Sequence, residues 1–212
     1  MNAHAATPDD IPAASHDPEP EPPPPSTRAQ RWLGVDPSPT WAAEFMRLLI
    51  ASGLASAFGV ALGLRHGGMT LLQGALGAPA GILAVAAVAV PAFAIVLALA
   101  NAPLQAMQLA QATTRAAMRA GLFLAGVAPA AALLVVTVED ATTVDALGFG
   151  GLAFAGWIAA SSFSAELRPA RRSAPAVTRA LLSVALPAFL LFAAVLAARV
   201  WWLALPVLTE IR

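Results

Sequence analysis

Five long apolar stretches that hold no charged residue constrain the fold of this chain more than any other feature. They comprise residues 48–64, 79–101, 120–138, 146–165 and 180–198. Each is close to the roughly 20 residues that an α-helix needs to cross a hydrocarbon core about 30 Å thick. The sequence therefore predicts an all-α fold, a polytopic transmembrane helical bundle of five spans.

The amino-acid composition is typical of a chain that lies in lipid rather than in water. Hydrophobic residues make up 58% of it and charged residues 11%, whereas a soluble domain carries about 25% charged residues. The absence of cysteine excludes disulfides, thiolate metal sites and cysteine nucleophiles. All 12 basic residues are arginine, and alanine is abundant. This bias is typical of a GC-rich genome, so we expect the inner membrane of a bacterium.

The chain divides into three predicted regions. Residues 1–27 form an acidic tail with a proline-rich run at 18–25, which we expect to be disordered with polyproline II character. A solvated spacer is favoured over a docking ligand, because no aromatic residue or arginine accompanies the prolines. Residues 28–47 form a membrane-proximal interfacial segment, and residues 48–204 form the transmembrane domain.

The arginines predict the orientation of the chain in the membrane. On one side lie Arg28, Arg31, Arg47, Arg115, Arg119, Arg168, Arg171, Arg172 and Arg179, and on the other side lies Arg65. By the positive-inside rule, nine arginines against one place the N-terminus in the cytoplasm. Trp201 and Trp202 at the end of the fifth span agree with this, since indole rings favour the headgroup layer.

The segment 102–118 between the second and third spans allows two interpretations. It mixes apolar residues with glutamine, threonine and arginine. It is either a short interfacial helix on the membrane surface or an extension of the second or third span. The sequence leaves both open.

Small residues recur at helical spacing in two spans. They are Ala51, Ala55, Gly59 and Gly63 in the first span, and Gly151, Ala155 and Ala159 in the fourth, beside a parallel stripe of Gly148, Gly156 and Ala160. Small residues four apart allow two helix backbones to approach closely in lipid. We interpret these residues as intramolecular helix-packing faces, with homodimerisation as the alternative.

Three spans carry an internal proline, at Pro91, Pro129 and Pro187. Proline removes one backbone hydrogen bond and predicts a helix kink, which a membrane protein tolerates when neighbouring groups satisfy the freed carbonyl. The sequences around Pro91 and Pro187 are alike. An inverted repeat would suggest a transporter with broken helices, but four matching residues in an alanine-rich chain do not establish one.

Catalytic and metal-binding patterns are absent from the sequence. The five stretches hold no ionisable side chain, which counts against a proton-coupled transporter. The three histidines do not form a pair of zinc ligands. We therefore predict no catalytic, cofactor-binding or metal-binding residue, and no cofactor. Glu139, Asp140 and Asp145 are the one carboxylate cluster between spans, and a hydrated loop is favoured there over a lipid-modifying enzyme.

Several short patterns resemble those of the Yip1-domain family. They are Pro39-Thr40-Trp41 before the first span, Thr114-Arg115 ahead of Ala128-Pro129, and Arg179-Ala180-Leu181-Leu182 leading to Leu186-Pro187. The resemblance extends from Trp41 to Trp202 and implies a cytoplasmic N-terminus, five spans and a very short C-terminus. Members of the family in eukaryotes interact with small Rab-type GTPases. The tyrosine-containing motifs of the family have no counterpart here, so no functional residue is transferred.

Together these features predict a non-enzymatic integral membrane protein that acts as an adaptor or scaffold. We expect its partners to be the lipid bilayer and other membrane proteins or a second copy of itself. A net charge of zero gives no attraction to nucleic acid. The alternative is an accessory subunit of a transporter or permease.

Overall fold

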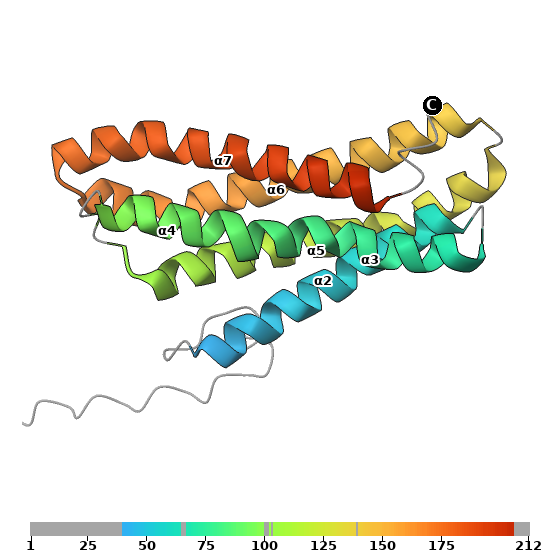
Figure 1. The fold of residues 1–212 in the computed structure, drawn as a ribbon, viewed down its shortest axis with the longest axis horizontal. Helices are drawn as coiled ribbons and strands as arrows, with labels where there is room; N and C mark the ends of the chain where they lie inside the picture. The colour runs from blue at the N-terminus through green and yellow to red at the C-terminus, as the bar shows by residue number, and fades with distance from the viewer. Residues whose placement is uncertain (1–39, 65–66, 100–101, 103, 139, 206–212) are drawn as a thin grey trace, which may run out of the picture. The chain divides into compact units, whose positions relative to one another are not determined.

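The computed structural model describes residues 40–64, 67–99, 102, 104–138 and 140–205, and every regular element among them is helical (Figure 1). The elements are α2 (Trp41–Gly63), α3 (Gly68–Ala84), the π-helix η1 (Val85–Ala89), α4 (Val90–Leu99), α5 (Ala106–Thr137), α6 (Ala141–Ser173) and α7 (Ala176–Ala204). Because α3, η1 and α4 follow one another without a break, five helical segments are long and apolar enough to cross a membrane. The predicted all-α fold with five spans is confirmed.

The helices are longer than the charge-free stretches that predicted them. The second helical segment begins at Gly68, eleven residues before the predicted start at residue 79. Helix α5 begins at Ala106, so the segment whose interpretation was open is the first three turns of the third span. The side chains of Gln105 and Gln108 form a reciprocal capping box at its start. Helix α5 continues through Arg115 and Arg119 because a helix that leaves lipid keeps its backbone hydrogen bonds. No charged residue lies between Gly68 and residue 79, so the predicted start of the second span was too late.

The predicted tail, residues 1–27, lies outside the described residues, as does the part of the interfacial segment before Thr40. The described remainder of that segment is continuous with the first span. Helix α2 begins at Trp41, where the hydroxyl of the N-cap residue Thr40 accepts a hydrogen bond from the backbone N–H of Ala43 at 3.3 Å.

The three predicted helix-kink residues lie inside helices and on their exposed sides. Helices α5 and α7 continue through Pro129 and Pro187. Pro91 is the second residue of α4, next to the π-helix η1. The N–H of Val90, which caps η1, bonds to the carbonyl of Val85, five residues earlier. The helix therefore changes its hydrogen-bond pattern at the point where proline removes one donor. The bends at the three prolines stay a prediction.

The small-residue face of α2 is buried against α3 and α5. Ala51 and Ala55 are fully covered, and Gly59 and Gly63 are also buried. A Cβ atom added to Gly59 would lie 1.9 Å from the carbonyl oxygen of Gly74 in α3. One added to Gly121 in α5 would lie 2.6 Å from the carbonyl oxygen of Ala51. The backbones of α2, α3 and α5 thus touch, and this face packs inside the chain.

The predicted face of α6 is only partly covered. Ala155 is buried, Ala159 is half-buried, and a Cβ atom on Gly151 would lie 2.6 Å from the ring of Phe58 in α2. The parallel stripe does not form a buried face. Gly148 is buried and Ala160 half-buried, but Gly156 is exposed with open space around it.

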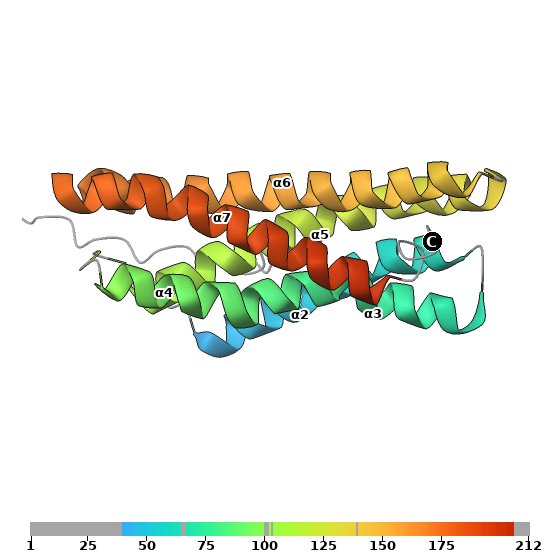
Figure 2. The same ribbon diagram turned by 45° about the horizontal axis from the view of Figure 1, so that its top comes forward.

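A third close approach joins α3 to α7, which runs from the end of α6 towards α3 (Figure 2). A Cβ atom on Gly77 would lie 2.9 Å from the carbonyl oxygen of Ala204, and one on Gly81 would lie 2.4 Å from the indole nitrogen of Trp201. That indole N–H donates to the carbonyl of Ala78 at 3.0 Å. Trp201 therefore packs against a neighbouring helix, while its neighbour Trp202 is 43% exposed. Their position in the headgroup layer stays a prediction.

Large side chains fill the remaining space in two clusters. One surrounds Phe58, Leu124 and Leu152, which come from α2, α5 and α6. The other contains Phe93 of α4 and Phe189 of α7, whose rings stack with centroids 4.3 Å apart. The second cluster adjoins the arginine-rich end of the helices, where the polar side chains of the chain also gather.

Candidate functional site

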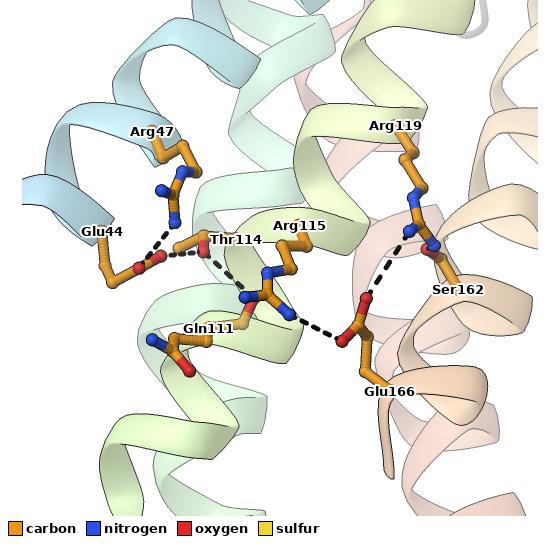
Figure 3. A network of polar contacts seen from close by, with 8 residues as sticks. All are labelled: Glu44, Arg47, Gln111, Thr114, Arg115, Arg119, Ser162 and Glu166. Atoms are coloured by element: carbon orange, nitrogen blue, oxygen red, sulfur yellow. Dashed lines mark hydrogen bonds and ion pairs between the residues drawn. The ribbon is translucent and has the colours of Figure 1, made fainter. Parts of the chain in front are cut away.

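A polar network joins α2, α5 and α6 near their arginine-rich ends (Figure 3). Its members are Glu44 and Arg47 of α2, Gln111, Thr114, Arg115 and Arg119 of α5, and Ser162 and Glu166 of α6. It holds three guanidinium groups and two carboxylates. Its opposite charges almost balance, so the network can hold helices together without a large excess of charge.

Glu44 is the most deeply buried member, with 3% of its surface exposed. One carboxylate oxygen accepts a hydrogen bond from the guanidinium of Arg47 at 2.6 Å. The other accepts the hydroxyl of Thr114 in α5. A carboxylate removed from water is costly unless it is paired and hydrogen-bonded. Both of its oxygens have such a partner, so the position of α2 on α5 is tied to this residue.

Glu166 is held between two arginines of α5. Its carboxylate oxygens lie 2.8 Å from the guanidinium of Arg115 and 3.5 Å from that of Arg119. Arg119 also donates to the hydroxyl of Ser162, one helical turn before Glu166. Arg115 and Arg119 of α5 therefore face Ser162 and Glu166 of α6. The members of each pair are four residues apart on their helix.

Helix geometry explains how one stretch of α5 reaches both neighbours. Residues four apart on an α-helix lie on one face, whereas adjacent residues are rotated by about 100°. Thr114 therefore faces α2 while Arg115, the next residue, faces α6. This places α5 in the middle of the network.

The network lies where the apolar part of the bundle ends. Arg119 directly precedes the charge-free part of α5, and Glu166 directly follows that of α6. The side-chain exposure rises from 4% at Glu44 to 23% at Glu166 and 53% at Arg119. Its buried end therefore acts as a structural clamp, and its exposed end can meet water or headgroups.

The six predicted topology-setting arginines form two groups. Arg115 and Arg119 belong to the polar network. The other four line a pocket of about 220 Å³ at the connection between α6 and α7: Arg168, Arg171, Arg172 and Arg179. That these six arginines set the orientation of the chain in the membrane stays a prediction.

The predicted carboxylate cluster is divided by the start of α6. Glu139 lies outside the described residues. Asp140 is the N-cap residue of α6, and the hydroxyls of Thr142 and Thr143 each donate to it at 2.6 Å. These hydrogen bonds, followed by those from the two backbone N–H groups, lower the pKa of Asp140 to about 2. Among the described residues, no group of three or more histidine, cysteine or carboxylate side chains could hold a metal ion.

Sequence reasoning did not single out Glu44 and Glu166. Both lie outside the charge-free stretches, which drew attention away from them. The available signal was spacing: Glu44 precedes Arg47 by three residues, and the pairs Arg115/Arg119 and Ser162/Glu166 share a spacing of four. This spacing predicts an ion pair between two helices only if the helices are known to be neighbours, and the sequence does not show which helices are neighbours.

Comparison with models of protein families, with curated proteins and with solved structures found no match. The geometry of the helices and of the polar network is therefore the basis for assigning a function.

Proposed function

We propose that this chain is a non-enzymatic, multi-pass protein of the bacterial inner membrane that acts as an adaptor or scaffold by lateral association with another membrane protein. Its N-terminus faces the cytoplasm in this proposal. The observation that carries it is the outer face of α6, which exposes an apolar and aromatic stripe. Within it the ring of Phe154 lies against Phe123 of α5 with centroids 4.9 Å apart, while Trp157 is 70% exposed. Resemblance to the Yip1-domain family adds support of the same kind, since that family is adaptor-like.

The stripe consists of Gly150, Phe154, Trp157 and Ser161, all of them exposed. Their spacing of four, three and four residues places them on one side of the helix. Trp157 is 70% exposed and Phe154 is 53% exposed. Gly150 has no described atom within 4 Å of an added Cβ, so it leaves room for a second backbone to approach.

Trp157 favours a protein partner over lipid at this face. Trp157 lies near the middle of the charge-free stretch of α6, far from the interfaces where tryptophan is enriched. Its indole N–H needs an acceptor in hydrocarbon, where no water is present. A helix of a second protein can supply that acceptor and cover the ring.

The polar network in the interior of the bundle also supports the proposed scaffold role. Its buried carboxylate and guanidinium groups bond to one another and hold α2, α5 and α6 in register. A bundle fixed in this way presents a constant outer surface, which is what a scaffold requires.

Site-specific photocrosslinking tests the proposal. A photoreactive amino acid at position 157 should give a discrete protein adduct in native membranes. The matched control is position 191 on α7, where Leu191 is 68% exposed and where we expect lipid adducts. Lipid adducts alone at both positions would contradict the proposal.

A second candidate is an accessory subunit of a transporter or permease. The specific observation in its favour is η1, since π-turns in helices often mark functional sites and here one adjoins Pro91. In that case Pro91→Ala should lower substrate flux in the natural complex several-fold while leaving the melting temperature within a few degrees. Unchanged flux would exclude a role for this turn in transport.

A further inference from the structure

The connection between α6 and α7 carries a concentration of positive charge that the polar network does not use. Arg168, Arg171, Arg172 and Arg179 line one pocket. Among the described residues, the first three take part in no ion pair. Guanidinium groups present planar arrays of N–H donors that match phosphate oxygens. The pocket therefore suits a single phosphate group.

The fourth arginine fixes the shape of the pocket. The guanidinium of Arg179 donates to the backbone carbonyls of Arg172 at 3.3 Å and Ala174 at 3.1 Å. These carbonyls end α6 and carry its negative partial charge, so a cation is favoured there. Arg179 thereby holds the start of α7 against the end of α6 and keeps the other three arginines around one space.

The depth of the pocket matches the headgroup layer. Arg168 is three residues past the charge-free stretch of α6, or about 4.5 Å at 1.5 Å per residue. The headgroup layer extends about 5–8 Å beyond the hydrocarbon on each side. Arg179 directly precedes the charge-free stretch of α7, so one arginine from each wall of the pocket lies within this layer, while Arg171 and Arg172 extend beyond it.

An exposed apolar stripe of α7 lies on the side of the helix opposite to Arg179 and so faces away from the pocket. Val177 is 82% exposed, Leu181 44% and Val184 72%. Their spacing of four and three residues places them on one side of the helix. The stripe therefore does not extend the pocket. The position of the arginines directly outside the charge-free stretches of α6 and α7 favours the phosphate of a lipid headgroup over free phosphate.

We propose that the pocket formed by Arg168, Arg171, Arg172 and Arg179 binds the phosphate group of one anionic phospholipid. The site depends on insertion of the bundle in a membrane and is independent of the association through α6. Either inference can fail without the other.

Native mass spectrometry of the full chain in a neutral detergent tests the site. The probes are dioleoyl phosphatidylglycerol, dioleoyl phosphatidylcholine with the same chains, and inorganic phosphate. We expect one phosphatidylglycerol to bind at least tenfold more tightly than phosphatidylcholine. The variant Arg168→Gln/Arg171→Gln/Arg172→Gln should bind phosphatidylglycerol about 100-fold more weakly at low salt, because each basic residue near an anionic lipid contributes about fivefold.

Two further variants separate the site from general charge and from misfolding. Arg199→Gln, which removes an exposed arginine near the other end of α7, should change the affinity less than twofold. Arg168→Lys/Arg171→Lys/Arg172→Lys keeps the charge but loses the planar donor arrays, so it should bind phosphatidylglycerol more weakly than the parent and more tightly than the glutamine variant. If the triple glutamine variant fails to fold, Arg171→Gln alone should show the fivefold loss.

Three results would overturn the proposal. Equal affinities of the glutamine variant and Arg199→Gln would show that the pocket is not the site. Equal affinity for both lipids would exclude recognition of an anionic headgroup. Displacement of the lipid by an equal concentration of inorganic phosphate would identify free phosphate as the ligand instead.

Discussion

The crossing of α2 and α3 at Gly59 leads to the sharpest prediction about stability. A Cβ atom at this position would lie 1.9 Å from the carbonyl oxygen of Gly74, whereas ordinary contacts begin at 3.4 Å. The obstacle is backbone rather than a flexible side chain, so the two helices must separate by about 1.5 Å to admit a methyl group. That separation would also loosen contacts along the rest of the crossing.

The expected cost follows from two opposing terms. Replacing glycine by alanine inside a helix gains up to about 1 kcal/mol of helix propensity. Overpacking a well-packed interface costs about 1–3 kcal/mol, and a backbone obstacle places Gly59→Ala at the upper end. The matched control is Gly53→Ala in the same helix, where an added Cβ meets nothing within 4 Å. Because both variants gain the same propensity, their difference isolates the clash at about 3 kcal/mol.

Reversible unfolding in mixed micelles, followed by circular dichroism, measures this difference. We expect Gly53→Ala to be as stable as the parent or slightly more stable. The folded-to-unfolded ratio of Gly59→Ala should be more than 100-fold lower than that of Gly53→Ala. Equal stability of the two variants would refute the close approach of α2 and α3.

Three further predictions concern single polar groups. Arg47→Gln removes the guanidinium partner of the buried Glu44 and should destabilise the fold by about 3 kcal/mol, whereas Arg119→Gln at the exposed end should cost less than about 1 kcal/mol; unfolding measurements that reverse this order would contradict the graded burial of the network. Trp201→Phe loses a hydrogen bond to α3 and should cost about 1 kcal/mol, visible as a lower melting temperature. The pKa of Asp140 is lowered from 3.8 to about 2 in the folded chain, so its stabilising effect is complete above pH 4 and is lost as the pH falls through 2. The melting temperatures of the parent and of Asp140→Asn should therefore differ by a constant amount above about pH 5 and converge at low pH, and a difference that grows on acidification would oppose this sign.

Most of the predicted packing residues lie in α2. They could be recognised from the sequence because their pattern is contained within one helix. Ala51, Ala55, Gly59 and Gly63 share one side of a helix and offer a smooth surface. In lipid such a surface gains by close contact with another helix. The partner that completes the crossing, Gly74, lay before residue 79, where the second span was predicted to begin, although no charged residue separates the two.

The polar network could not be predicted in the same way. Glu44 and Thr114 are 70 residues apart, and Arg115 and Glu166 are 51 apart. Whether such side chains meet depends on the rotation of each helix and on the angle at which it crosses its neighbour. Neither quantity is present in the local pattern of any one span.

The sequence alone determined that this is an all-helical protein with five spans, because the thickness of the hydrocarbon core requires a minimum run of apolar residues. Only the tertiary structure decided which side chains meet. It paired the buried Glu44 with Thr114, turned Trp201 onto α3 and gathered four arginines around one pocket. The physical reason is that insertion in lipid depends on hydrophobicity summed along one helix, whereas these contacts depend on where the glycine-lined backbones of different helices touch.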